Sequence, residues 1–328
     1  MRSRKRYGKT SKIKYMNTKT ILSKFPKFIE DWKKYKKKFP RVREWYIASD
    51  YCFNKDSEKP TKVMTFTLCP AVNLEWLQDQ ISRFLKSDVK NRKNFSDVEI
   101  QFIRDNGYFF SIVIIIKNVD LSLVDKLKQT LDSWIQQLEQ GEKNRNSAER
   151  LKRFYKLKQY LNQKSYSADL VSKITLVACI VGMIAEFLVV KHGAQKLLWI
   201  SDRGKVIDFK EGIVIELANI NYHNLVNGRT GQKVLLGVAK EDSVTKRFDF
   251  DPMIRYPDII SGVFSSTDLD KNISTGQKHF DMFVNAIAGN RRIHSLIWND
   301  GNLQEGYRID KLNDEKGIIR AAFIKQEP

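Results

Sequence analysis

The 328-residue sequence predicts a mixed α/β fold in which a sheet is flanked by helices. Two short apolar segments, 44–53 and 196–201, are rich in Trp, Tyr, Ile and Leu and are typical of buried strands. A long apolar segment, 167–191, is typical of a central helix. No internal repeat or low-complexity linker follows the basic N-terminal segment, so we expect an arm over residues 1–43 and a single domain over residues 44–328.

The composition favours a folded, reduced and soluble protein. Hydrophobic residues make up 42% of the chain, which is enough for a core and argues against general disorder. Cys52, Cys69 and Cys179 lie far apart and match no zinc spacing, so we expect reduced core residues in a cytoplasmic protein. No secretory signal is visible, and the apolar run 174–185 is too short for a membrane span. We expect a buried helix there and no membrane contact.

The positive charge is concentrated near the N-terminus. The net charge is +20, and residues 1–44 carry 17 Lys or Arg against three acids. Such a segment is typical of a contact with nucleic acid, although it also suits a solubilising tail. The residues expected to contact DNA or RNA are Arg2, Arg4, Lys5, Arg6, Lys33, Lys34, Lys36, Lys37 and Lys38.

Aromatic residues alternate with lysines in the segment 28–39, which predicts a short helix. Phe28, Trp32, Tyr35 and Phe39 fall on one side of it. Aromatic rings among lysines suit a surface that binds single-stranded nucleic acid. At this helical spacing, the same rings would equally well dock the arm onto the rest of the protein.

In the first half of the domain, the strand 44–53 and a second strand at 63–70 predict a hairpin. A helix follows over 72–86. The turn 105–107, Asp-Asn-Gly, lies between two β-rich runs and predicts a second hairpin. The run after that turn, 109–116, is continuously apolar and predicts a central strand that is buried on both faces.

The second half begins with a helical hairpin inserted at 120–163, in which one face is rich in Lys and Arg. The long helix 167–191 and the strand 196–201 come next. The segment 212–226 fits either a helix or a strand, and 233–242 predicts an edge strand.

The C-terminal part alternates between helices and strands. We expect a helix that Pro257 opens at 257–266 and another helix at 279–289. The segments 293–298 and 317–325 predict strands.

Both apolar strands end in Ser-Asp, at Ser49-Asp50 and Ser201-Asp202. A carboxylate at the tip of a buried strand is costly to remove from water unless something neutralises it. If the strands are neighbours, the two carboxylates could share one or two divalent cations. The alternative is that each Asp simply opens a turn.

The order of these features resembles that of the RNase H-like nuclease superfamily, in particular its uncharacterised bacterial members. A first strand ends in Asp50, a long helix leads into a strand that ends in Asp202, and a late helix begins with Pro257-Asp258. The resemblance covers residues 44–118 and 167–270. It implies an RNase H-like mixed sheet and cleavage of phosphodiester bonds with Mg²⁺ or Mn²⁺ bound by Asp50, Asp202 and Asp258.

The resemblance also implies a Glu on the central helix, and Glu186 is the acid that this helix offers in its middle or end. Glu186 is therefore a fourth catalytic candidate, with an ion pair to Lys191 as the alternative. Related bacterial proteins often continue the first strand with Asp-Glu-Ser-Gly, whereas this chain has Asp50-Tyr51-Cys52.

Asp258 has two interpretations. Ser261, Gly262 and Ser265 share its helix face, and this small polar face would allow a metal or a nucleic-acid strand to approach. The alternative is an acid that the helix dipole favours in a first helical turn.

Three functions remain open at this point. The first is a metal-dependent nuclease of DNA or RNA, and the second is a nucleic-acid-binding or assembly module without catalysis. The third is a protein-interaction component that docks through the hairpin 120–163, which would require an exposed apolar face there. A meeting of Asp50, Asp202 and Asp258 in space would favour the nuclease.

Overall fold

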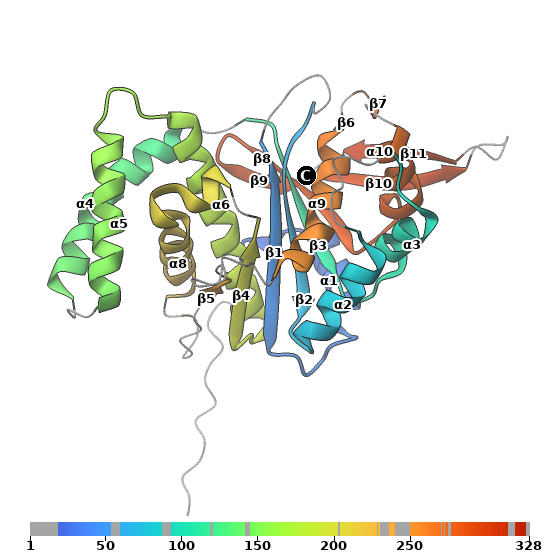
Figure 1. Ribbon diagram of the computed structural model, residues 1–328, viewed down its shortest axis with the longest axis horizontal. Coiled ribbons are helices and arrows are strands. Elements are labelled where there is room, and N and C mark those ends of the chain that lie inside the picture. The colour runs from blue at the N-terminus through green and yellow to red at the C-terminus, as the bar shows by residue number, and fades with distance from the viewer. Residues whose placement is uncertain are drawn as a thin grey trace, which may run out of the picture.

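The computed structural model contains a seven-stranded mixed sheet between two layers of helices, which confirms the predicted α/β class (Figure 1). In spatial order the strands are β5 (Leu236–Val238), β4 (Lys196–Ser201), β1 (Glu44–Cys52), β2 (Lys62–Pro70), β3 (Phe110–Ile116), β8 (Ile293–Asn299) and β9 (Asn302–Glu305). The structure describes residues 19–53, 60–86, 93–118, 121–141, 145–202, 204–227, 229, 236–239, 250–269, 271, 273–274, 277–313 and 319–325.

The strand directions bring several strand ends to one edge of the sheet. Strands β1, β2 and β3 form an antiparallel meander, so β3 runs parallel to β1. Strand β4 is parallel to β1, β5 is parallel to β4, and β8 is parallel to β3. The C-terminal ends of β1, β3, β4, β5 and β8 therefore lie at the same edge, which we call the C-terminal edge of the sheet.

One face of the sheet is covered by a group of helices that we call the α6 layer. The central helix α6 continues into a π-helical segment, η2, and the hairpin and N-terminal helices pack around it. The elements are η1 (Leu22–Lys24), α1 (Pro26–Lys36), α4 (Ser122–Gln140), α5 (Arg145–Leu161), α6 (Ala168–Glu186), η2 (Phe187–Lys191), α7 (Lys205–Asp208), η3 (Phe209–Glu211) and α8 (Ile213–Val226).

Helix α6 is the predicted central helix, and it is a core element. The helical stretch Ala168–Lys191 is long and apolar enough to cross a membrane, but 72% of its most apolar window is buried inside the protein. It packs against α8 and leads through η2 into β4. Its apolar sequence is therefore explained by burial on nearly all sides. The segment 212–226, which fitted either structure in the sequence, is a helix.

Helix α1 docks onto the body of the protein. Phe28 and Trp32 are fully buried, and the Trp32 ring packs edge-on against Phe110 of β3 and Phe187 of η2. Of the two interpretations of this aromatic stripe, docking is confirmed. Residues 22–36 thus belong to the core, although the sequence placed them in an arm.

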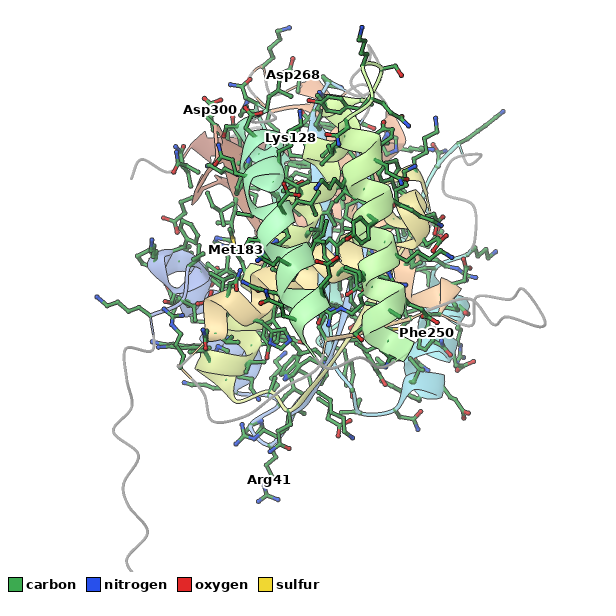
Figure 2. All side chains as sticks on the ribbon, turned by 90° about the vertical axis from the view of Figure 1, so that its left-hand side faces the viewer. Arg41, Lys128, Met183, Phe250, Asp268 and Asp300 are labelled. Atoms are coloured by element: carbon green, nitrogen blue, oxygen red, sulfur yellow. The ribbon has the colours of Figure 1, made fainter. Side chains whose placement is uncertain are left out.

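The predicted helical hairpin is present as α4 and α5, and it faces the viewer in Figure 2. Its apolar side chains, among them Leu127, Leu131 and Phe154, are buried in the same core as α6. Arg150 and Arg153 of α5 both pair with Glu216 of α8. The exposed large apolar side chains on the described part of the hairpin are Leu121 and Tyr155, so the apolar face that a docking partner would need is already covered.

The opposite face of the sheet is covered by what we call the α9 layer. Its helices, together with Ala48, Val113 and Ile200 of the sheet, form a second core cluster. The elements are α2 (Leu74–Phe84), α3 (Asp97–Asp105), α9 (Asp251–Ser265), α10 (Gln277–Met282) and the π-helical η4 (Phe283–Ile287).

The prediction of a hairpin around residues 105–107 is wrong, because the run before that turn is helix α3. Ser96 caps the helix: its side chain accepts from the Glu99 amide, and the Glu99 side chain accepts from the Ser96 amide. This capping box is a strong helix start. Asn106 ends the helix, and its side chain accepts from the Tyr108 amide at 2.9 Å.

The prediction that Pro257 opens a helix is also wrong, because α9 begins at Asp251 and contains Pro257 in its interior. The proline near the helix start is Pro252. Asp258 consequently lies in the middle of the helix. The helix dipole acts within the first turn, so it does not account for an acid at this position.

The remaining strands lie outside the main sheet. They are β6 (Thr267–Asp268), β7 (Ile273–Ser274), β10 (Tyr307–Asn313) and β11 (Ile319–Lys325), and they form two separate two-stranded ladders. The expected strands at 293–298 and 317–325 are confirmed, and β5 is an edge strand as expected. Cys52, Cys69 and Cys179 are free thiols.

Candidate active site

Asp50 lies near the end of β1 and points toward the α9 layer. Side chains alternate between the two faces of a strand. Trp45 and Ile47 pack in the core beneath α6, whereas Ala48 packs in the core beneath α9. Asp50 shares the face of Ala48 and is only 7% exposed.

Strand β4 places Asp202 next to the end of β1. Ser49 and Ser201 are paired in the parallel register, and the Asp202 amide donates to the Ser49 carbonyl oxygen at 3.0 Å. The two Ser-Asp segments are thus adjacent at the C-terminal edge of the sheet. The Asp202 side chain is exposed, so it lies at the solvent side of the site.

Helix α9 places Asp258 over the same strands. Ser261, one turn after Asp258, lies with its hydroxyl 2.9 Å from Thr65 Oγ1 of β2 and 3.4 Å from the backbone oxygen of Asp50. Small residues on this face of α9 let the helix approach β1 and β2 closely. Asp258 itself is half-buried.

The pKa of Asp50 responds to the carboxylates of both Asp258 and Asp202. Burial raises the pKa of Asp50 to about 7, with further contributions from the charges of Asp258 and Asp202. Hydrogen bonds from Ser261 and the Tyr51 backbone lower the pKa of Asp50 only in part. A buried carboxyl beside two others keeps its proton up to about neutral pH unless a cation offsets the negative charge.

The donor chemistry of this site fits Mg²⁺ or Mn²⁺, because both ions prefer carboxylate oxygens. Among the residues that the structure describes, no group of three or more His, Cys, Asp or Glu side chains is arranged to hold a metal ion. The three aspartates are therefore electrostatic neighbours without a ready-made coordination sphere.

A network of hydroxyl groups supports the two Ser-Asp segments from the opposite face of the sheet. Ser49 Oγ lies 2.7 Å from the Tyr51 hydroxyl and accepts from Trp199 Nε1 at 2.9 Å. Ser201 Oγ donates to the Tyr51 hydroxyl at 3.0 Å. These bonds tie β1 to β4 one residue before each aspartate. The repeated Ser-Asp pattern is the sequence signal that could have revealed the network.

Glu186 is not brought to the aspartates. It is 1% exposed at the end of α6, on the opposite face of the sheet, where it pairs with Arg229 and accepts from the Ile21 amide at 3.5 Å. Burial raises the pKa of Glu186, and the nearby Arg229 partly opposes that shift. Arg229 also donates to the Lys19 carbonyl at 2.9 Å. The contacts of Glu186 thus fasten the N-terminal segment to the α6 layer.

The basic residues expected to contact nucleic acid lie in two groups. Lys33, Lys34, Lys37 and Lys38 are exposed on and just after α1. Lys36 is half-buried, donates to the Val42 carbonyl at 3.2 Å and lies over the Trp45 ring. Arg2, Arg4, Lys5 and Arg6 lie outside the described residues.

The exposed lysines of α1 lie away from the aspartates. Helix α1 leads into the N-terminal end of β1, whereas Asp50 is near the C-terminal end of that strand. Figure 2 shows the two ends of the molecule: Arg41, just before β1, and Asp268, just after α9, are at opposite extremes. A nucleic acid that contacts both groups would have to run along the molecule.

Comparison with known proteins gives no family assignment. No protein-family model matches the chain, and neither a curated protein nor a solved structure matches it.

Proposed function

We propose that the protein is a divalent-metal-dependent nuclease that hydrolyses phosphodiester bonds of DNA or RNA. The observation that supports this proposal is that Asp258 and Asp202 lie close enough to the buried carboxyl of Asp50 to act on its charge. The pKa of Asp50 is raised by burial and then by Asp258 and Asp202. A buried site that gathers like charges is typical of catalytic centres and cation sites.

The arrangement of elements supports an RNase H-like core as part of this proposal. The superfamily has an acid on its first strand, another at the end of the strand that follows a central helix, and a last one on a late helix. In this chain Asp50 lies on β1, Asp202 directly follows β4 after α6, and Asp258 lies on α9. Strand β4 is also the parallel neighbour of β1.

The roles of the residues follow from their positions. Asp50 and Asp202 would hold Mg²⁺ or Mn²⁺ at the C-terminal edge of the sheet, with Asp258 completing the set from above. Such ions activate water and stabilise the leaving oxygen of a phosphodiester. Asp50 supplies a rigid, buried ligand, whereas the exposed Asp202 can adjust to an arriving ion or phosphate. Glu186 is assigned a structural role because its carboxylate is paired with Arg229.

The proposal is tested by cleavage assays on the purified full chain with Mg²⁺ or Mn²⁺, using single- and double-stranded DNA and RNA. We expect Asp258→Asn to reduce cleavage, because it removes one carboxylate of the set. Glu186→Gln and Asp79→Asn, the latter an exposed residue of α2, should keep cleavage close to wild type. Metal-independent cleavage, or full activity of Asp258→Asn, would contradict this assignment of the site.

A second candidate is a nucleic-acid-binding module without catalysis. This candidate is favoured by one finding: the described residues hold no preformed group of three metal ligands. Under this alternative, nucleic acid binds to the wild type while no substrate is cleaved with either ion.

Both candidates predict that residues 1–18 contribute affinity through charge. These residues carry seven Lys or Arg and no acid. Each phosphate that a basic side chain neutralises releases about one counterion. Deleting these residues should therefore weaken binding and reduce the slope of log K against log salt by roughly 0.9 for each phosphate that they neutralise. The deletion ends before Lys19 and Ile21, whose backbones bond to Arg229 and Glu186, so it should leave the fold intact.

The matched control replaces Lys33, Lys37 and Lys38 by Gln in the full chain, which removes exposed charge without shortening it. Nucleic-acid binding measured from low to moderate salt would show whether residues 1–18 or these three lysines contact the phosphate backbone. An unchanged slope in the deletion variant would mean that residues 1–18 do not contact nucleic acid.

A further inference from the structure

A second polar site lies at the other end of the sheet from Asp50. A cavity of about 170 Å³ opens between α1, the turn at 288–292 and the first residues of β8. Strand β8 begins there, and it runs parallel to β3 and so to β1. The cavity is therefore at the N-terminal edge of the sheet. None of the residues that line the cavity belongs to the candidate active site.

Two cationic side chains, one carboxylate and one imidazole are among the residues that line this cavity, and two of these four are buried. Asp31 of α1 is 5% exposed and His294 of β8 is 8% exposed. His294 Nε2 is buried and has no hydrogen-bond partner. Lys27 and Arg291 are the other two, and Lys27 Nζ lies 3.4 Å from Asp31 Oδ1. A buried polar atom without a partner is uncommon and calls for an explanation.

The charges of the cavity do not balance. Lys27 and Arg291 are two cations, and Asp31 is the carboxylate that lies between them. Burial raises the pKa of Asp31, while the charges of Lys27 and Arg291 lower it. Burial and the charge of Lys27 lower the pKa of His294 to about 4, so its imidazole is neutral at pH 7. Glu30 lies outside the cavity lining and pairs with Lys34, with Lys27 at 3.4 Å and with Arg291 at 3.9 Å, so these three cations share two carboxylates.

We propose that this cavity binds a phosphate group, either as a small phosphate ester or as the terminal phosphate of a nucleic acid. Lys27 of α1, Arg291 of the turn and His294 of β8 all line the cavity, and Lys27 and Arg291 can each donate to a phosphate oxygen. A phosphate offers three acceptor oxygens and suits such a set, and its contacts with Lys and Arg are charge-assisted. The excess of one positive charge favours an anion over a neutral ligand.

The size of the cavity and its surroundings limit the ligand. Pockets for drug-sized molecules occupy about 300–1,000 Å³, so a cavity of about 170 Å³ suits a phosphate and a few further atoms. Gly289 lines the cavity with a φ of 74°, and a Cβ at this position would meet no atom within 4 Å. The turn thus keeps this side of the cavity open.

The test titrates inorganic phosphate into the full-length wild type and follows the imidazole signal of His294 by NMR, assigned with His294→Gln. Bound phosphate should raise the pKa of His294, since a nearby anion favours the charged imidazole. Arg291→Gln should weaken phosphate binding about tenfold or more, because it removes one charge-assisted bond. Arg83→Gln, an exposed arginine of α2, is the matched control and should bind like wild type.

Asp31→Asn is the decisive variant, because the direction of its effect on phosphate affinity separates the proposed site from a structural role of Asp31. It removes one carboxylate that competes for Lys27 and Arg291, so phosphate should bind several-fold more tightly. A purely structural Asp31 would give no such gain. Absence of phosphate binding at millimolar concentration, or equal affinities in wild type, Arg291→Gln and Asp31→Asn, would overturn the proposal.

Two further ligands identify the source of the phosphate. Ribose 5-phosphate represents small phosphate esters, and a short oligonucleotide with or without a 5′-phosphate represents a nucleic-acid end. Tighter binding of the sugar phosphate than of inorganic phosphate assigns the site to a small ester. A gain that depends on the 5′-phosphate assigns it to a nucleic-acid end. Neither outcome depends on cleavage, so this site can fail or stand separately from the proposed nuclease.

Discussion

Asp50→Asn should abolish metal-dependent cleavage and, without metal, make the protein more stable at neutral pH. Loss of a residue that merely orients a metal ligand costs about 10–100-fold in activity or metal affinity, so loss of a buried ligand should cost more than about 100-fold. The gain in stability has a separate cause. Burial, Asp258 and Asp202 disfavour the charged form of Asp50 in the folded protein.

The sign of the pH dependence follows from the pKa of Asp50, which is about 7 in the folded state against 3.8 for an ordinary Asp. Between these values the folded protein binds more protons than the unfolded chain, so its stability falls as pH rises. Asn cannot ionise and removes this loss. The difference in the free energy of unfolding between Asp50→Asn and wild type should grow from about pH 3.8 to about pH 7. It should reach on the order of 2–4 kcal/mol and stay constant at higher pH.

Urea denaturation of wild type and Asp50→Asn at several pH values measures this difference, with Asp79→Asn as the exposed control. Adding Mg²⁺ or Mn²⁺ should raise the melting temperature of wild type by mass action and have little effect on Asp50→Asn. Parallel stability profiles for wild type and Asp50→Asn would show that the charge of Asp50 is not penalised. Equal metal stabilisation of both would place the ion elsewhere.

Trp32→Ala should destabilise the protein by about 3–5 kcal/mol, the usual cost of truncating a buried aromatic residue to alanine. The Trp32 side chain is fully buried, and its ring lies against Trp45, Phe110, Phe187 and His192. Chemical denaturation at neutral pH measures the loss. The same reasoning predicts that removing residues 1–43 as a whole unfolds the protein rather than only weakening its nucleic-acid binding.

Two controls separate burial from other effects at this helix. Trp32→Phe keeps most of the apolar volume and removes an indole N–H that has no hydrogen-bond partner, so its cost should be much smaller. Lys33→Ala changes the exposed neighbour and should alter stability by less than about 0.5 kcal/mol. If Trp32→Ala unfolds at the wild-type denaturant concentration, α1 does not belong to the core.

The elements that the sequence predicted best are those with a strong local pattern and full burial. The segments at 44–53, 167–191 and 196–201 are mostly apolar, and they became β1, α6 with η2, and β4. The failures occurred where two local signals competed. Asp-Asn-Gly at 105–107 suggested a hairpin, but Ser96 and Glu99 formed a capping box, and the turn residues ended a helix instead.

The part of the candidate site that lies at strand ends could be predicted from the sequence. Which end of the sheet a helix residue reaches could not be predicted, because that depends on the direction of the helix in the fold. Asp50 and Asp202 follow from the repeated Ser-Asp at two strand ends. Glu186 does not join them because α6, the last α-helix between β3 and β4, leads the chain to the start of β4. Since β3 and β4 both run parallel to β1, a residue late in that helix lies toward the N-terminal edge of the sheet. The cavity at His294 has no sequence motif, because α1 meets there the turn 288–292 and β8, which are distant from α1 along the chain.

The position of α1 also has a consequence for how the protein is made. During synthesis α1 emerges well before Phe187, one of the rings that cover Trp32, because Phe187 lies 155 residues after Trp32 in the chain. Until then the aromatic stripe of α1 lacks part of its native cover, although Trp45 and Phe110 have already been made. Contacts between residues so distant along the chain are slow to form, and domains with many of them expose apolar surface while folding. Helix α1 is therefore among the segments most in need of chaperone protection on the ribosome.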